Sequence, residues 1–206
     1  MASKRQRWRN NRNKRRVVTN KLADCESLED LLRNLKIQPT EWDVLIVGDG
    51  SGTTWERECG WGSVLIDKHS FMRIPFWGGF NLGTVNVAEM MAYLHPILWL
   101  IKNRKHWLLT TLKIHIVTDS QYVANGINSV QVGSENQTLW QALLSAKRHG
   151  IRLTGHWIPR DTLDLNQLAH NLANQSRLSQ QGLIDKALKD QGVVSLDELT
   201  PDSKQD

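Results

Sequence analysis

Three acidic residues stand at points of the sequence where they could act together on a metal ion. Asp49 follows the apolar run VLIVG and Asp119 follows the run IHIVT, and each run is typical of a buried strand. Glu89 is flanked by Ala88 and two methionines. A carboxylate in such apolar surroundings needs a partner, because burying an unpaired charge is costly. A hard divalent cation such as Mg²⁺, which prefers oxygen ligands, is one such partner.

The ordinary alternative is that the three acids are unrelated: a turn aspartate, a capping aspartate and a glutamate in a salt bridge. Their occurrence at matching structural positions favours a metal site instead. Acids that follow neighbouring strands of an α/β sheet meet at the edge where ligands usually bind. Two ions about 4 Å apart, held by such acids, can contact both the attacking and the leaving oxygen of a phosphodiester.

Hydrophobic periodicity predicts the elements that must position these acids. We expect strands at residues 43–52, 59–67, 69–80, 112–120 and 151–158, and helices at 86–103, 120–129, 136–150 and 163–181. The first of these helices should be interrupted near Pro96, and the last should begin with a capping-box-like pair, Asp164 and Gln167. The order predicts an α/β fold: a five-stranded mixed sheet, with a three-strand antiparallel meander and two parallel strands, and helices on both faces.

The charge of the chain is unevenly distributed. Residues 1–21 hold nine Lys and Arg and no acid, whereas the remainder holds 17 basic and 21 acidic residues. We therefore divide the chain into a disordered basic arm at 1–22, a short amphipathic helix and linker at 23–40, a catalytic domain at 41–180, and a polar to acidic tail at 181–206. Ser27 is the expected N-cap of the short helix. A basic arm of this kind is expected to contact nucleic-acid phosphates.

Several protein classes are disfavoured by composition. The chain has no apolar run of the roughly 18 residues needed to span a bilayer, so we expect no membrane segment. The basic N-terminus is not followed by the apolar segment of a secretory signal. Cys25 and Cys59 fit no zinc-binding spacing and suggest no disulfide framework. These observations predict an intracellular, cytoplasmic protein, which we expect to be a monomer.

Four motifs in order resemble the type 1 ribonuclease H family. IVGDGSG with GWGSVLI is similar to the opening hairpin of that family, and TVNVAEMMA to its first helix with a glutamate. IVTDSQYVANGI resembles its third acidic motif, and LTGHWIPRDTLDLNQLAHNLA its closing histidine loop and helix. The motifs cover residues 43–178. The resemblance implies the RNase H-like fold and a metal-dependent endonuclease that hydrolyses the RNA strand of RNA/DNA hybrids.

The resemblance also implies a mechanism and a set of metal ligands. Asp49, Glu89 and Asp119 would hold two Mg²⁺ or Mn²⁺ ions, and cleavage would leave 5′-phosphate and 3′-hydroxyl ends. His156 matches the flexible-loop histidine of the family, which assists proton transfer or product departure. Two alternatives stay open: a catalytically weak or inactive protein that binds hybrids, and a DNA-processing nuclease, similar to a resolvase or transposase, on the same fold.

Substrate contacts are implied in the same way. Family members reach 2′-hydroxyls of the RNA strand with main-chain groups and amides, which can both donate to and accept from that group. A phosphate of the DNA strand is held in a separate pocket, where Leu82 stands in place of a frequent arginine. The implied RNA contacts are Gly50, Ser51, Asn86 and Gln121, the implied phosphate contacts are Thr84 and Asn136, and Asn166 of the closing helix completes the predicted substrate-binding set.

One position departs from the family pattern. The fourth metal ligand is usually an aspartate four residues after an asparagine of the closing helix, and counting from Asn166 gives His170. The leucines of this helix form its predicted core face, so Asn166 and His170 should point away from it. In one reading neutral His170 ligates or orients a metal, which could favour Mn²⁺. In another, Asp161 or Asp164 substitutes. In a third, the protein only binds hybrids.

A second departure from the family pattern concerns a basic segment that binds the substrate. Many bacterial members carry a long basic handle between their middle helices, whereas only NSVQVGSE lies between ANGI and NQTLW here. The basic arm at residues 1–21 could take over this role.

Overall fold

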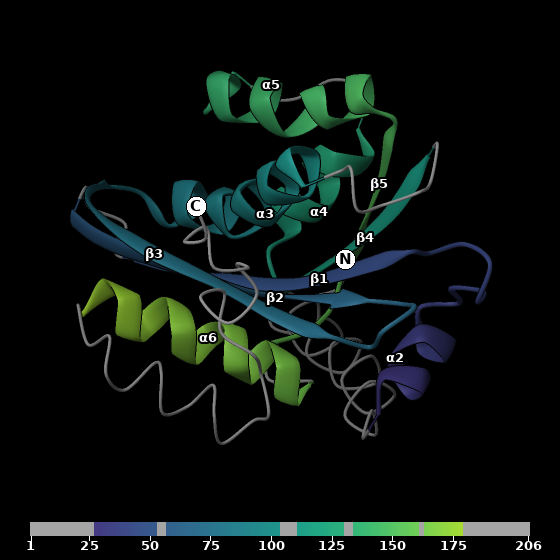
Figure 1. The fold of residues 1–206 in the computed structure, drawn as a ribbon. Helices are drawn as coiled ribbons and strands as arrows, with labels where there is room; N and C mark the ends of the chain where they lie inside the picture. Colours follow the sequence, from purple (N-terminus) through teal and green to yellow (C-terminus); the bar gives the residue numbers. More distant parts are fainter. Residues whose placement is uncertain (1–26, 53–56, 104–110, 130–133, 161–162, 179–206) are drawn as a thin grey trace, which may run out of the picture.

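The chain folds around a five-stranded mixed sheet with helices on both faces (Figure 1). The computed structural model describes residues 27–52, 57–103, 111–129, 134–160 and 163–178. The strands lie in the order β3-β2-β1-β4-β5, with β1 antiparallel to β2, β2 antiparallel to β3, and β4 parallel to both β1 and β5. The strands are β1 Val44–Ser51, β2 Arg57–Asp67, β3 Arg73–Gly83, β4 Leu112–Thr118 and β5 Ile151–Trp157. The predicted fold class is confirmed.

The helices cover the sheet in two layers (Figure 1). The helices α3, α4 and α5 pack on one face, and α6 and α2 lie on the other. Their bounds are α2 Leu28–Asn34, α3 Val85–Lys102, α4 Gln121–Asn128, α5 Gln137–Ser145 and α6 Asp164–Arg177, with a 3-10 helix at Ala146–His149. The predicted order of strands and helices is confirmed.

Strand β1 is the middle strand of the sheet and is buried on both faces. Val44 and Ile46 belong to the core under α3, whereas Leu45 and Val47 belong to the core under α6. This alternation is the period of two that a strand imposes, and its apolar residues on both sides are typical of a strand covered by two helical layers. The position of β1 fixes Asp49 in the middle of the molecule.

Helix α2 packs on the body of the fold. Leu31 and Ile37 are buried in the core shared with β1 and α6. Ser27 caps the helix as predicted, since its hydroxyl accepts a hydrogen bond from the N–H of Asp30. The residues from this helix to β1 therefore form part of the folded domain.

Helix α3 continues through Pro96, so the predicted interruption was wrong. A proline inside a helix removes one N–H donor and crowds the preceding turn. Here Tyr93, Ile97 and Leu100, which flank it, are fully buried against the sheet. Helical stability in proteins comes mostly from such packing, and the packing outweighs the local cost of the proline.

Helix α6 begins differently from the prediction. Asp164 is its first residue rather than its cap, and Leu163, the N-cap, offers no side-chain hydrogen bond, so the capping box was wrong. Leu163 is buried in the core under the sheet, and the N–H of Gln167 donates to its carbonyl oxygen. Hydrophobic anchoring of Leu163, in place of a polar cap, sets the start of this helix.

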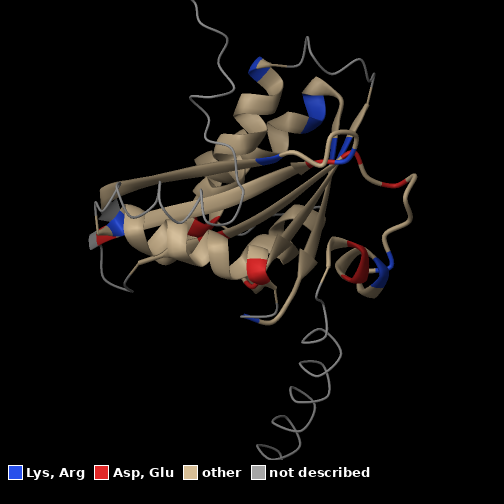
Figure 2. Cartoon of the chain, turned by 60° about the horizontal axis from the view of Figure 1, so that its bottom comes forward, with Lys and Arg blue, Asp and Glu red and all other residues tan. Residues whose placement is uncertain are grey.

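Lysine and arginine residues in the described part of the chain are spread over several helices and strand ends (Figure 2). The dense run of positive charge at residues 1–21 and the tail at 181–206 lie outside the described residues. None of the helices that the structure describes is both long and apolar enough to cross a bilayer.

Candidate active site

The structure brings Asp49, Glu89 and Asp119 together from three elements. Asp49 lies in β1, Glu89 on the second turn of α3, and Asp119 directly after β4. One ligand oxygen from each carboxylate lies within 4.8 Å of the other two. They converge because β1 and β4 are parallel neighbours, paired up to Val47 and Val117, and therefore deliver the two aspartates to the same edge.

A tyrosine and a glycine set the spacing of this cluster. The hydroxyl of Tyr93 donates to the carbonyl oxygen of Gly48 at 2.6 Å and lies 3.0 Å from that of Val117, so it connects β1 and β4 just before their acids. A Cβ atom on Gly50 would lie 2.4 Å from the backbone nitrogen of Glu89. Only a glycine at this position lets α3 approach β1 closely enough to bring in the glutamate.

The three carboxylates lie close together and are largely shielded from solvent. Burial raises the pKa of Glu89 well above its usual range, and the negative charges of Asp49 and Asp119 raise it further. Burial also raises the pKa of Asp49, with the charge of Asp119 adding to the effect. The Oε2 atom of Glu89 and the Oδ1 atom of Asp119 are buried and have no hydrogen-bond partner among the described residues.

These oxygens fit a hard divalent cation. Buried polar atoms in proteins nearly always have a partner, so two unpaired carboxylate oxygens in one cluster need an explanation. Mg²⁺ and Mn²⁺ bind carboxylate oxygens, and either ion would pair these atoms and offset the repulsion among the three acids. The donor set is thus suited to the metal that the sequence predicts.

Arg160 also contacts the cluster, and sequence reasoning missed it. Its Nε atom donates to Asp119 Oδ2 at 2.9 Å, and its guanidinium lies 3.9 Å from Asp49 Oδ1. The loop that carries it is tied down, since the indole N–H of Trp157 donates to the carbonyl oxygen of Asp119. The only sequence signal is its proximity to the histidine motif in GHWIPR.

His170 faces Asp49. Its Nδ1 lies 2.5 Å from Asp49 Oδ2, and its Nε2 lies 2.8 Å from Nδ2 of Asn174, one turn later on α6. Asn166 is buried, with an exposed fraction of 2%, so the prediction that it points away from the packed face was wrong. Asp164 is exposed at the start of α6 and is not in the carboxylate group, and Asp161 lies outside the described residues.

His156 does not lie with the carboxylates. It belongs to β5 rather than to the loop that follows, and its Nε2 is 2.7 Å from Nδ1 of His115. His115 Nε2 donates to the carbonyl oxygen of Glu41, so His115 Nδ1 accepts from the N–H of His156. Burial lowers the pKa of His156 to about 4, with a smaller effect from His115. The two rings line a separate cavity of about 280 Å³ with Lys36, Lys113 and Arg152.

The remaining predicted substrate contacts lie at the ends of elements. Ser51 ends β1, and Asn86 is half-buried in the first turn of α3. Thr84 caps α3, Gln121 is exposed at the start of α4, and Asn136 caps α5 in a left-handed conformation while donating to the hydroxyl of Tyr122. The side chain of Leu82 lies outside the described part. Helix starts offer unpaired N–H groups, which suits contact with phosphates.

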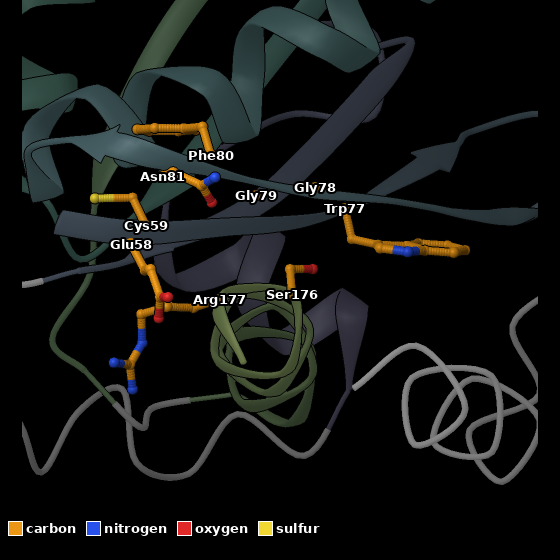
Figure 3. Close-up of a pocket in the computed structure, with 9 residues that line it drawn as sticks. All are labelled: Glu58, Cys59, Trp77, Gly78, Gly79, Phe80, Asn81, Ser176 and Arg177. Atoms are coloured by element: carbon orange, nitrogen blue, oxygen red, sulfur yellow. The ribbon is translucent and has the colours of Figure 1, made fainter. Parts of the chain in front are cut away.

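A second cavity lies between β2, β3 and the end of α6 (Figure 3). It has a volume of about 310 Å³ and is lined by Cys59, by Gly78 and Gly79 of β3, and by Arg177. Burial raises the pKa of the Cys59 thiol. The Nε atom of Arg177 also donates to the hydroxyl of Ser51, so this cavity adjoins the end of β1.

The sheet order, with acids on β1, on α3 and directly after β4, defines the class of RNase H-like folds. The model of the RNase H family matches residues 41–177, and the chain belongs to that family. No curated protein matches the chain.

Solved structures show the same fold. RNase H1 from Halobacterium salinarum is 19% identical, with 66% of this chain and 98% of that chain covered and a TM-score of 0.50. LC11-RNase H1, isolated from compost and solved with an RNA/DNA hybrid, is 20% identical, with 70% and 99% covered and a TM-score of 0.53. The N-terminal RNase H domain of a Mycobacterium tuberculosis protein is 18% identical, with 72% and 97% covered and a TM-score of 0.52.

Proposed function

We propose that the protein is a metal-dependent endonuclease that hydrolyses the RNA strand of RNA/DNA hybrids and leaves 5′-phosphate and 3′-hydroxyl ends. The observation that carries this proposal is the convergence of Asp49, Glu89 and Asp119, with two buried oxygens unpaired, in a chain of the RNase H family. A similar structure, LC11-RNase H1, was solved with an RNA/DNA hybrid, which supports the choice of substrate.

In this proposal Asp49, Glu89 and Asp119 hold two Mg²⁺ or Mn²⁺ ions. Such ions supply a nucleophilic water at neutral pH and stabilise the charge that develops on the phosphate. The protein supplies the rest. Tyr93 fixes the spacing of β1 and β4, and Gly50 leaves room for Glu89. His170 contacts Oδ2 of Asp49, whereas Arg160 lies nearer to Oδ1. For His156 to assist in proton transfer, its ring would have to leave His115.

Substrate recognition is assigned to the rim of the carboxylate cluster. Gly50 and Ser51, at the end of β1, and the amides of Asn86 and Gln121, at helix starts, are proposed to bind 2′-hydroxyls, the groups that distinguish RNA from DNA. Thr84 and Asn136 are proposed to bind a phosphate of the DNA strand. Asn166 is buried, so we place it behind the site, where it supports α6 rather than contacts substrate.

One assay tests the activity. Hybrids labelled on the RNA strand are incubated with the purified chain in Mg²⁺ or Mn²⁺, beside duplex DNA, duplex RNA and an Asp49→Asn control. We expect cleavage of the hybrid RNA alone, with 5′-phosphate ends and no cleavage by the control. Cleavage of duplex DNA would instead assign a DNA-processing role. Hybrid binding without cleavage in either metal would assign a binding protein, an outcome for which the imidazole at position 170 is the motivating observation.

The basic arm is proposed to replace the missing handle. Nine positive charges in residues 1–21 would release counterions from bound nucleic acid, which makes affinity steeply dependent on salt. Deleting residues 1–21 should raise the Kd for a hybrid and flatten the plot of log Kd against log salt. Equal Kd values for both proteins at low and physiological salt would exclude this role of the arm.

A further inference from the structure

A continuous chain of hydrogen bonds runs from the end of α6 to the carboxylate cluster. Arg177 Nε lies 3.1 Å from Ser51 Oγ, and Ser51 Oγ lies 2.5 Å from Asn174 Oδ1. Asn174 Nδ2 lies 2.8 Å from His170 Nε2, and His170 Nδ1 lies 2.5 Å from Asp49 Oδ2. We call these five residues the α6–β1 chain. It connects the cavity beside Arg177 (Figure 3) with Asp49.

The donor and acceptor atoms give each bond a direction. A guanidinium can only donate, so Ser51 Oγ accepts from Arg177. An amide oxygen can only accept, so the Ser51 hydroxyl donates its proton to Asn174 Oδ1. The oxygen of the Asn174 amide is thereby occupied, and its NH₂ group faces His170. An NH₂ group can only donate, so His170 Nε2 must carry a lone pair rather than a proton.

The protonation of the other ring nitrogen of His170 follows from this. A neutral imidazole has one protonated and one unprotonated nitrogen, so Nδ1 carries the proton and donates to Asp49 Oδ2. Asp49 is nearly fully buried, and its other oxygen accepts from the N–H of Gly50 at 2.8 Å. Each oxygen of Asp49 therefore has one donor from the protein and keeps a lone pair that a cation can use.

We infer that His170 is a positioning residue: as an Nδ1–H imidazole, oriented by Asn174, Ser51 and Arg177, it holds Asp49 in place and does not itself ligate metal. The inference rests on the proposed function in one respect, that Asp49 is a metal ligand. Residues that hydrogen-bond to metal ligands fix their orientation, and their loss commonly weakens metal binding about 10- to 100-fold. An imidazole can do this at position 170 without adding a fourth negative charge to an already crowded site.

The tautomer is tested directly by NMR. The full-length chain is labelled with ¹⁵N-histidine, and long-range ¹H–¹⁵N correlations are recorded at neutral pH, with His170 assigned through His170→Gln. We expect a protonated Nδ1 and an unprotonated Nε2, both without metal and at saturating Mg²⁺. A protonated Nε2 in the wild-type protein, in either condition, would overturn the inference.

Three variants test what orients the ring. Asn174→Asp keeps the shape of the side chain but replaces the donor by an acceptor, so Nε2 of His170 should become protonated. Arg177→Lys keeps a donor-only group and should retain the wild-type tautomer. Arg177→Leu removes the donor and should give a mixture of tautomers. An unchanged His170 spectrum in Asn174→Asp would show that the α6–β1 chain does not control the ring.

Metal ligation is tested without substrate. ¹¹³Cd²⁺ is added to the ¹⁵N-histidine-labelled full chain, and the ring nitrogens of His170 are searched for a signal that is split by ¹¹³Cd–¹⁵N coupling, which requires a direct metal–nitrogen bond, and that disappears in His170→Gln. We expect no such signal, because His170 stays outside the coordination sphere. Its presence would make His170 a ligand and overturn the inference. These readouts do not require hydrolysis, so a failure of the proposed nuclease activity would be recognised separately by the cleavage assay.

Discussion

The guanidinium of Arg160 donates to Asp119 at 2.9 Å and lies 3.9 Å from Asp49, so one arginine contacts two of the three carboxylates that are suited to a metal. The guanidinium binds Asp119 Oδ2, whereas the unpaired Oδ1 of the same carboxylate is the atom suited to a metal. Because both cations are positively charged, we expect Arg160 to repel a metal bound at Asp119. The loop between β5 and α6 thus influences the strength of the metal site.

Replacing Arg160 by alanine should tighten metal binding. The side chain is 56% exposed, and an ion pair with this exposure is worth about 1 kcal/mol or less. We therefore expect the Kd for Mn²⁺ in the absence of nucleic acid to fall by up to about fivefold in Arg160→Ala, measured by titration calorimetry. Arg33→Ala, which breaks an exposed ion pair with Asp30 on α2, is the matched control. Weaker Mn²⁺ binding by Arg160→Ala would mean that the arginine supports the site.

Removing the charge of Glu89 should stabilise the metal-free protein. Its pKa is raised by burial and then by Asp49 and Asp119, so the folded state favours the protonated form. The resulting stability is present below the ordinary glutamate value of about 4.3 and is lost as pH rises towards the raised value. In EDTA, Glu89→Gln should therefore have the higher Tm at pH 8, with the difference shrinking towards pH 4.

Adding metal should reverse the order of the two Tm values. Mg²⁺ neutralises the cluster, so we expect it to raise the Tm of the wild-type protein at pH 8 and to have little effect on Glu89→Gln. Glu29→Gln, on an exposed position of α2, controls for the change in net charge. A Tm of Glu89→Gln below that of the wild-type protein at pH 8 in EDTA would contradict the proposed repulsion.

His156 should make the fold sensitive to acid. Burial, and then the neighbouring His115, lower the pKa of His156 to about 4, so the folded state favours the neutral ring. The stability that this contributes is present above the ordinary histidine value of about 6.5 and is lost as pH falls through about 4. The free energy of unfolding in urea should fall less steeply from pH 7 to pH 4 in His156→Gln than in the wild-type protein. His149→Gln, at an exposed position, should keep the wild-type slope.

The hydroxyl of Tyr93 should matter for both stability and metal binding. Tyr93→Phe removes the donor to the buried carbonyl oxygen of Gly48, at a cost of about 1–3 kcal/mol in the free energy of unfolding. It also loosens the connection between β1 and β4, so the Kd for Mn²⁺ should rise. Tyr122→Phe removes a hydroxyl that contacts Trp140 and Asn136 and is the natural comparison. An equal change in Mn²⁺ affinity in both variants would mean that the link between the strands is not responsible.

Much of the fold could be predicted because its signals are local. Apolar runs around Asp49 and Asp119 identify central strands, and the order of strands and helices leaves few topologies. The errors also have local causes. Pro96 predicts a break that core packing prevents, and Asp164 has the chemistry of a cap although burial of Leu163 sets the start of α6.

The sequence by itself determined which residues could form a metal site, because the acids are marked by the apolar runs beside them and by the order of the family motifs. It also determined that an imidazole occupies position 170. Only the tertiary structure decided that Arg160 shares Asp119, that His156 pairs with His115, and that His170 lies between Asp49 and Asn174. These relationships join residues far apart in the chain, and the direction of a hydrogen bond depends on which atoms meet, which no pattern of residue types specifies.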